Sequence, residues 1–267
     1  MKRCSLKIAL TLLVAAAALA CANDDSSDKT TPSTGGTTSI GPLENFSFFV
    51  TSRASLFQLS GSANGFGGDL RYGQADGLAG ADKICAKIAD LSMPGASAKG
   101  WRAFLSVTAG PDGNPVNAID RIGEGPWYDR LGRMVSPDKA SLLNPRPIGA
   151  NASIVNDLPN EFGTMNSTAE GKEVNNHDTL TGTTQQGQLA ATTRNNTCND
   201  WTSAEGALGQ PQIGHSWRRN ATDGINWIAE HPAPGCAAGA SEVLNGGGLC
   251  VGCSGGYGGV YCFALKP

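Results

Sequence analysis

The chain has 267 residues, of which 16% are charged and 36 are glycine, and its formal net charge at pH 7 is −3. So few charged residues and so much glycine are not typical of a helical bundle and favour a fold with many loops. The acidic balance argues against a nucleic-acid partner, because nucleic acids are bound by clustered basic residues.

Residues 1–20 have the pattern of an export signal. Basic residues are followed by an apolar run over residues 8–20 that is too short to span a bilayer as a helix. Small residues then precede Cys21, and this arrangement resembles a lipoprotein signal in which Cys21 becomes the acylated first residue of the mature chain. An ordinary cleaved signal peptide is the alternative.

Residues 21–43 are polar and show no apolar periodicity. A segment of this composition cannot bury enough apolar surface to offset the entropy of ordering, so we expect a disordered tether. A lipid on Cys21 would then hold the rest of the chain at a membrane of the cell envelope. By resemblance to other bacterial lipoproteins, the lack of an aspartate directly after Cys21 favours the outer membrane or the cell surface.

Residues 44–267 are long enough for one large domain. β-forming residues predict a strand over residues 48–52, followed by a Ser/Gly-rich loop that runs through Gly68. Apolar residues at spacings of three and four predict a helix over residues 78–91, with Cys85 on its buried face. A nearly apolar run predicts an internal strand over residues 101–107.

The rest of the chain has weaker local signals. Apolar spacing is compatible with a short helix over residues 116–122, and a turn sequence predicts a hairpin over residues 126–135. Residues 144–194 are polar and aperiodic, which predicts a long loop that is functional or loosely ordered. Alternating side chains predict a final strand over residues 259–265 that carries Cys262.

The cysteines outside the leader and the lipidation site are even in number, which indicates a disulfide framework in an exported protein. They are Cys85, Cys198, Cys236, Cys250, Cys253 and Cys262. Their spacing alone leaves the connectivity open. Cys250 and Cys253 also have the spacing of a redox or metal-binding motif, but no second close cysteine pair accompanies them.

Four segments together resemble a known family. Residues 80–85 and 100–106 look like the first-helix cysteine and the following strand of endostatin, and residues 197–203 and 253–262 resemble its remaining cysteine segments. The same strings resemble a bacterial family of surface lipoproteins of unknown function. That resemblance implies an α+β fold of the C-type lectin-like, endostatin-like kind, with a mixed and mostly antiparallel sheet, two helices, long loops and disulfides.

The resemblance also implies a disulfide connectivity. Its first-to-last bridge would join Cys85 to Cys262. Its nested bridge would join Cys198 to Cys253, which leaves Cys236 and Cys250 for a third bridge.

Neither metal site of the resembled folds is carried by this sequence. C-type lectins bind calcium through a Glu-Pro-Asn or Gln-Pro-Asp loop and a Trp-Asn-Asp strand, and these motifs are absent here. The zinc site of endostatin uses histidines near its N-terminus, whereas the first histidine here is His177. We therefore expect no metal, no cofactor and calcium-independent binding.

No catalytic residue is expected. The pairs His177–Asp178 and His215–Ser216 are adjacent in sequence, but no nucleophile or zinc motif surrounds them. The acidic residues Asp120, Glu124 and Asp129 could in principle form a glycosidase pair, but a solvated acidic turn explains them as well.

The remaining candidates are residues that could touch a ligand. Exposed tryptophans bind sugars and form interface hot spots, so Trp217 and Trp227, in loop-rich surroundings, are candidate ligand-binding residues together with His215. The sequence thus predicts a membrane-anchored surface lipoprotein for non-catalytic binding or adhesion to a protein or glycan. The alternative is a cell-envelope hydrolase that acts on glycan or peptidoglycan.

Overall fold

The computed structural model describes residues 43–169, 175–191, 193–220, 222, 224–240 and 247–266, which all belong to the compact unit Ile40–Pro267. The expected signal peptide, Cys21 and all of the expected tether but Leu43 lie outside the described residues. Within the described ranges, no helix is both long and apolar enough to cross a membrane.

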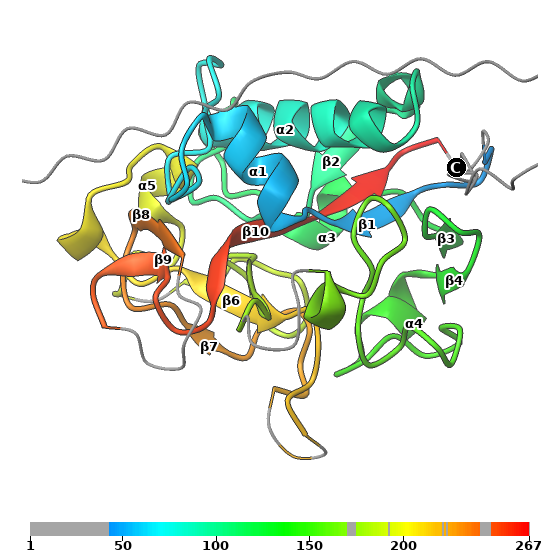
Figure 1. The fold of residues 1–267 in the computed structure, drawn as a ribbon. Coiled ribbons are helices and arrows are strands. Elements are labelled where there is room, and N and C mark those ends of the chain that lie inside the picture. Colours follow the sequence, from blue (N-terminus) through cyan, green and yellow to red (C-terminus); the bar gives the residue numbers. More distant parts are fainter. Residues whose placement is uncertain are drawn as a thin grey trace, which may run out of the picture. The chain divides into compact units, whose positions relative to one another are not determined.

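The fold is α+β, with a mixed main sheet of six strands (Figure 1). The strand order is β1 (Phe48–Val50), β10 (Gly256–Ala264), β5 (Asp178–Leu180), β6 (Gln212–His215) and β7 (His231–Pro232), with β2 (Trp101–Ala103) also paired to β10. The β10–β5 pair is parallel and the other pairs are antiparallel. The final strand therefore occupies the middle of the sheet.

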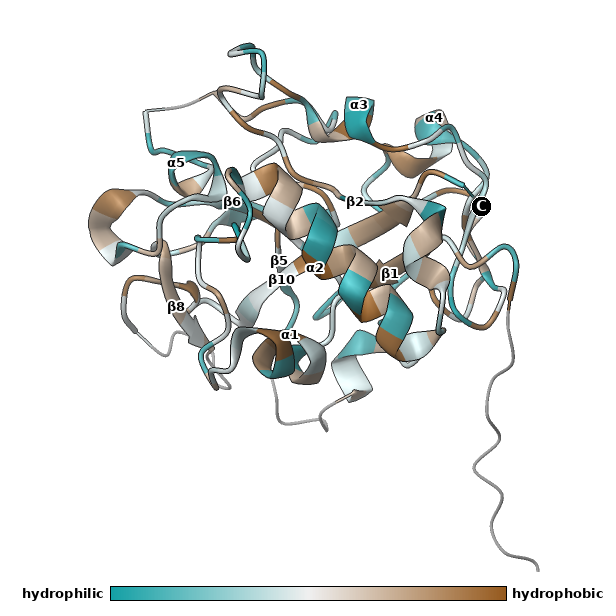
Figure 2. Ribbon diagram, turned by 90° about the horizontal axis from the view of Figure 1, so that it is seen from above, coloured by the Kyte–Doolittle hydropathy of each residue, from teal (hydrophilic) through white to brown (hydrophobic). Residues whose placement is uncertain are grey.

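Two helices precede most of the sheet: α1 (Arg53–Ser60) and α2 (Gly77–Ser92). The carboxylate of Asp76 caps α2 by accepting a hydrogen bond from the Ala79 N–H. The apolar stripe of α2 packs against β2, and hydrophilic residues occupy other positions along the helix (Figure 2). The stripe ends before Leu91, which is exposed although its spacing predicted burial.

Shorter elements complete the fold. They are the helices α3 (Ala118–Arg121), α4 (Lys139–Leu142) and α5 (Cys198–Trp201), the 3-10 turns η1 (Ala96–Lys99), η2 (Asn166–Thr168) and η3 (Gly206–Leu208), and two small sheets, β3 (Trp127–Tyr128) with β4 (Met134–Ser136) and β8 (Ala237–Ala240) with β9 (Cys250–Gly252). The predicted hairpin over residues 126–135 is confirmed as β3 and β4.

The main sheet separates two hydrophobic clusters. Side chains alternate along β10, so Cys262 and Ala264 pack with α2, whereas Tyr261 and Phe263 belong to the second cluster. Because both faces of β10 are covered, all nine of its residues are buried. This explains why the final segment contains so few polar side chains.

Two predictions for the backbone are wrong. The Ser/Gly-rich stretch after β1 begins with α1, whose first turn is capped by Ser52 and which ends at Gly61 in a left-handed conformation. The expected loop over residues 144–194 contains β5, which lies between β10 and β6 and is fully buried. The predicted strand over residues 101–107 is shorter and ends at Ala103.

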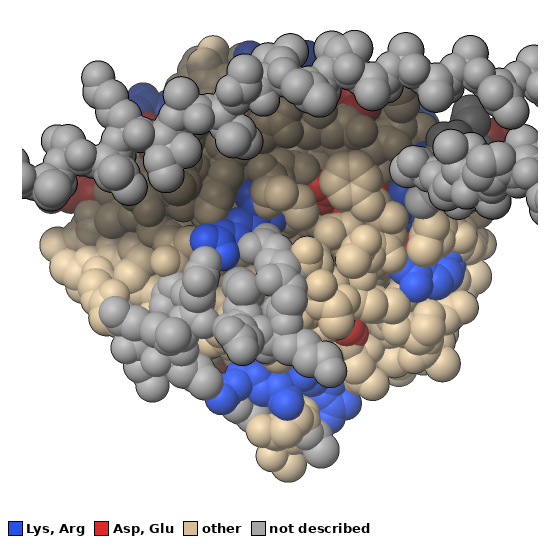
Figure 3. All heavy atoms as spheres, viewed as in Figure 1, with Lys and Arg blue, Asp and Glu red and all other residues tan. Residues whose placement is uncertain are grey.

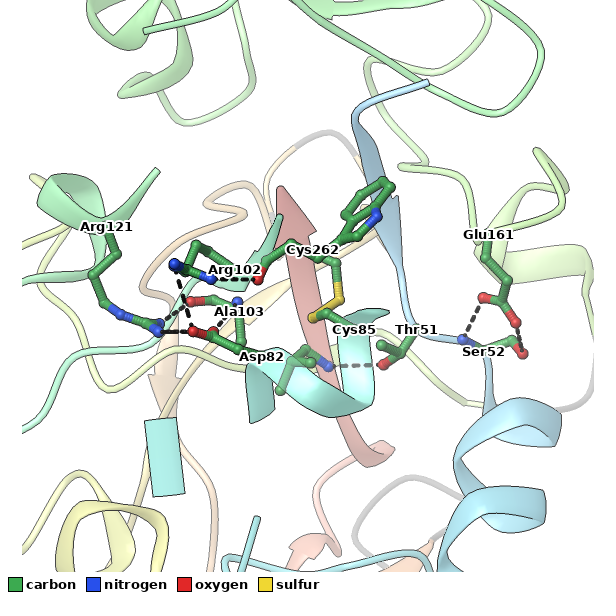
Figure 4. The surroundings of a disulfide bond; sticks show 11 residues. Thr51, Ser52, Asp82, Cys85, Arg102, Ala103, Arg121, Glu161 and Cys262 are labelled. Atoms are coloured by element: carbon green, nitrogen blue, oxygen red, sulfur yellow. Dashed lines mark hydrogen bonds and ion pairs between the residues drawn. A yellow bond between two sulfur atoms is a disulfide. The ribbon is translucent and has the colours of Figure 1, made fainter. Parts of the chain in front are cut away.

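The Cys85–Cys262 bridge is confirmed, and it joins α2 to β10 across 177 residues (Figure 4). In the same view, Asp82 of α2 accepts hydrogen bonds from the Arg121 guanidinium and from the Ala103 N–H, so that α2, α3 and β2 are tied together beside the disulfide. Covalent and charge-assisted contacts therefore fasten the same helix to the sheet.

The other two predicted bridges are wrong. The structure joins Cys198 to Cys236 and Cys250 to Cys253. A tight turn, in which the Cys253 N–H donates to the Cys250 carbonyl, brings the Cα atoms of that pair to 5.1 Å, within the range that a disulfide spans. Among the described residues all six cysteines are bridged, so none offers a free thiolate to a metal ion in this structure.

Candidate metal centre

All three histidines of the chain converge on one carboxylate. The Nε2 atoms of His177, His215 and His231 lie 3.0, 3.2 and 3.8 Å from Asp178 Oδ1. One ligand atom from each of the four residues can be chosen so that all lie within 4.8 Å of one another. We refer to these four residues as the histidine–aspartate cluster.

The main sheet places the four residues together. Asp178 is the first residue of β5 and pairs with His215, the last residue of β6, while His231 begins β7 and pairs with Ile213 of β6. His177 directly precedes β5, and its carbonyl accepts hydrogen bonds from the N–H and the hydroxyl of Ser216. Backbone pairing therefore fixes each residue before any side-chain contact is made.

A glycine on β10 makes room for the carboxylate. Asp178 pairs with Gly256, and a Cβ atom at that position would lie only 2.8 Å from the Asp178 Cβ. Two residues earlier, the Ser254 hydroxyl donates a hydrogen bond to Asp178 Oδ2. The turn before β10 thus holds one carboxylate oxygen and leaves Oδ1 directed at the histidines.

The cluster is largely buried but its polar atoms are not satisfied. His177, Asp178 and His215 are at most 2% exposed, whereas the side chain of His231 is 37% exposed. Asp178 Oδ1 accepts no hydrogen bond of regular geometry, although three ring nitrogens surround it. Nδ1 of His177 and Nδ1 of His215 also lack partners. Buried polar atoms without partners are uncommon in native proteins and require an explanation.

The electrostatics favour an ionised carboxylate beside a neutral imidazole. Burial raises the pKa of Asp178, but its close contacts with the ring nitrogens of His177 and His215 and the attraction of the nearby histidines more than offset burial, so that this pKa lies below its ordinary value. Burial lowers the pKa of His215, opposed by its contact with Asp178. A carboxylate anion and a neutral imidazole are the forms that bind metal ions.

Three imidazole nitrogens and one carboxylate oxygen suit a divalent transition metal, since calcium and magnesium require oxygen ligands. The sequence pattern marks His177, Asp178 and His215 only as catalytic or ligand-binding candidates and predicts no metal site, and it does not single out His231. The one available signal was that every histidine of the chain lies between residues 177 and 231. That signal could not show that β5, β6 and β7 are neighbours.

The three candidate ligand-binding residues, Trp217, Trp227 and His215, differ in how far they are buried. Trp227 is fully buried and its Nε1–H donates to the Leu142 carbonyl, so its assignment to a ligand surface is wrong. His215 is buried in the cluster and cannot contact a macromolecular ligand directly. Trp217 is half-buried, donates to Asn176 Oδ1 at 2.7 Å and packs edge-on against His177. Of the three, only Trp217 has an accessible ring.

The three acidic residues of the conceivable glycosidase pair have other partners. Asp129 is buried and forms an ion pair with Arg133, Glu124 pairs with Lys139, and Asp120 accepts a hydrogen bond from the Asn117 amide. Each carboxylate thus has a structural partner of its own.

Two cavities near the surface of the described residues lie away from the cluster. One of about 270 Å³ is bordered by Asp76, at the start of α2, and Asp200 of α5, and one of about 580 Å³ is bordered by Arg71 and Tyr72. On the face seen in Figure 3, basic side chains gather in a few patches, one of them at the lower edge, whereas acidic side chains are sparse. No protein-family profile and no curated protein sequence matches this chain.

Proposed function

We propose that this chain is a cell-envelope lipoprotein, anchored through Cys21, whose C-type lectin-like, endostatin-like domain binds a protein or glycan ligand without catalysis and without calcium. The resemblance of the cysteine segments supports the domain type. The α+β architecture and the Cys85–Cys262 bridge between the main helix and the last strand are consistent with it.

The distribution of exposed apolar side chains carries the proposal. Among the described residues, eight large hydrophobic side chains are exposed, and five of them fall between residues 144 and 249, the loop-rich part of the domain: Ile148, Phe162, Leu208, Ile225 and Leu249. Trp217, with its half-buried ring, belongs to the same part of the chain. Aromatic and apolar side chains on loops held by a rigid scaffold are the usual contacts of a binding surface.

A binding array tests the proposal directly. The full chain would be applied to immobilised glycans and extracellular-matrix proteins, with calcium and with a calcium chelator. We expect at least one ligand class to bind equally well under both conditions. Trp217→Ala should weaken that binding about tenfold or more, as for an interface hot spot. Leu91→Ala, which removes an exposed leucine from α2 outside the loop-rich part, is the matched control.

Two outcomes would contradict the proposal. One is binding that disappears when calcium is chelated. The other is a folded chain that binds nothing on the array, or whose binding is equally strong with alanine at residue 217.

A cell-envelope hydrolase is the second candidate, and one observation favours it. His231 is 37% exposed, so a small molecule could approach the histidine–aspartate cluster from that side. Release of soluble fragments from peptidoglycan by the wild-type chain, but not by Asp178→Asn, would establish this activity in place of the first.

A further inference from the structure

We propose that the histidine–aspartate cluster is a zinc site, in which Nε2 of His177, His215 and His231 and Oδ1 of Asp178 bind one Zn²⁺ ion. The site would hold the cluster's strands together and would not catalyse a reaction. This proposal is independent of the adhesive role proposed above, because it concerns the interior of the domain and not its ligand surface.

Hydrogen bonding within the cluster cannot satisfy its atoms. Nδ1 of His231 lies 3.0 Å from the Pro232 carbonyl, so it carries the proton and leaves a lone pair on Nε2. That lone pair faces Nε2 of His215 at 3.1 Å and the anionic Asp178 Oδ1 at 3.8 Å. Without a cation, the Nε2–H of His215 can donate to His231 and the Nε2–H of His177 to Asp178 Oδ1, which leaves the buried Nδ1 atoms of His177 and His215 without donors. A cation at the centre would instead use one inward-facing lone pair from each of the four residues.

Two of the four ligands, His231 and Asp178, have polar partners that orient them as second-shell groups do in metalloproteins. The Pro232 carbonyl fixes the tautomer of His231, and the Ser254 hydroxyl binds Asp178 Oδ2 and leaves Oδ1 for the ion. The backbone of Gly224, with φ +69°, lies directly against His215, where a Cβ atom would be 2.2 Å from Nδ1. Each of these contacts leaves the inward-facing donor atom uncovered.

The spacing of the donor atoms fits a tetrahedral ion. Zinc–nitrogen and zinc–oxygen bonds of about 2.0–2.1 Å place neighbouring ligand atoms about 3.3 Å apart in a tetrahedron. Four of the six separations between the donor atoms are 3.0, 3.1, 3.2 and 3.8 Å, and ligand atoms of all four residues lie within 4.8 Å of one another, so a tetrahedral ion would need only a slight contraction of the cluster. Three nitrogens exclude a calcium or magnesium preference, and four protein ligands in tetrahedral geometry are typical of structural zinc.

The location of the cluster indicates what the ion would stabilise. Its ligands come from the start of β5, the end of β6 and the start of β7, and Ser254 connects it to the turn before β10. The Cys85–Cys262 bridge fastens β10 to α2, whereas β7 is an edge strand of only two residues with no bridge of its own. A zinc ion would therefore clamp the edge of the sheet that the disulfide does not reach.

Metal analysis of the native protein tests the proposal. The full chain would be produced by export into an oxidising compartment, purified through a tag without histidine, and dialysed against metal-free buffer. Elemental analysis should give about one zinc per chain, and a zinc chelator should lower its melting temperature. Because the chain has only three histidines, any histidine-bound metal reports on this site.

Substitutions assign the ligands. Asp178→Asn and His215→Ala should each lower the zinc content to below about one tenth of the wild-type value, while the disulfides remain intact in a non-reducing peptide map. Asp157→Asn is the matched control, because Asp157 is also a largely buried aspartate that accepts from a serine hydroxyl, that of Ser167, but lies outside the cluster. It should keep its zinc.

The outcomes divide clearly. A wild-type chain that neither contains zinc nor takes it up from added zinc salt would overturn the proposal, and so would equal zinc content in Asp178→Asn. Cobalt substitution gives an independent reading that does not require variants. Intense visible bands of four-coordinate cobalt support the closed site, whereas the weak bands of six-coordinate cobalt contradict it.

Discussion

Removal of the Cys85–Cys262 bridge should destabilise the protein far more than removal of the Cys250–Cys253 bridge. A disulfide restricts the unfolded chain by the entropy of closing its loop, which grows with loop length. Sequence separations of 177 and 3 residues correspond to about 5 and about 2 kcal/mol at 25 °C. The Cys198–Cys236 bridge, with a separation of 38, should fall between them at about 4 kcal/mol.

Paired alanine variants measure this difference. Cys85→Ala with Cys262→Ala, and Cys250→Ala with Cys253→Ala, each remove two buried sulfur atoms, so the cavity contributions are similar. Urea unfolding followed by tryptophan fluorescence should place the first double variant about 3 kcal/mol below the second in free energy of unfolding. Since a typical domain is stable by only about 5–15 kcal/mol, the first variant should be close to unfolding at 37 °C. Equal losses in the two double variants would refute the loop-closure argument.

Three further predictions concern the interior. Trp227→Ala should lower the free energy of unfolding in urea by about 3–5 kcal/mol, because it empties a fully buried site and leaves the Leu142 carbonyl without its donor. Trp217→Ala should lower it by less than half as much. Similar losses in the two variants would show that Trp217 is also a core residue. Burial raises the pKa of Glu161 above 4.5, opposed by hydrogen bonds from Ser52 and Ser55, so its contribution to stability is present at low pH and is lost as pH rises through the folded-state pKa. The stability of the wild type relative to Glu161→Gln should therefore fall as the pH rises above 4.5, and a difference that stays constant above that pH would contradict the burial argument. Ser254→Ala leaves all four proposed zinc ligands in place but removes the hydroxyl that donates to Asp178 Oδ2. The zinc affinity, measured by competitive chelator titration, should therefore fall about 10- to 100-fold. An unchanged affinity would show that the hydroxyl does not orient the carboxylate.

The sequence predicts those helices and strands whose apolar periodicity matches the faces that they bury in the folded domain. The helix α2 combines an apolar stripe with the capping residue Asp76, and β10 alternates side chains for two buried faces, so sequence periodicity and burial coincide. The Cys85–Cys262 pairing came from resemblance to a family and agrees with the way α2 lies against β10.

Elements formed by distant partners were not predictable in this way. β5 contains only Asp178, Thr179 and Leu180, and its neighbouring residues are mostly polar, so no period of two marks it as a strand. It is a strand because β10 and β6 bond to both of its edges. The helix α1 was hidden for a different reason, since its serines suggested a loop although Ser52 is its cap.

The disulfide connectivity also depends on tertiary contacts. The Cys198–Cys236 bridge requires that residues near Gly68 hold both cysteines in place: the Gly68 N–H donates to the Cys236 carbonyl, and a Cβ at Gly68 would touch the Cys198 sulfur. Neither contact is encoded in cysteine spacing. A resemblance that is correct for the outer bridge therefore did not determine the inner ones.

The histidine–aspartate cluster follows from the same topology that hid β5. His177 and Asp178 could be recognised as neighbours in the chain, but His215 and His231 reach them only because β6 and β7 continue the sheet beyond β5. A polar strand in the middle of a sheet is costly unless its side chains find partners, and Asp178 is a buried anion whose Oδ1 has only imidazoles beside it. A bound cation would explain why β5 begins with an aspartate. Asp178 is unfavourable for a buried strand, but as a metal ligand it would join β5, β6 and β7 to one ion.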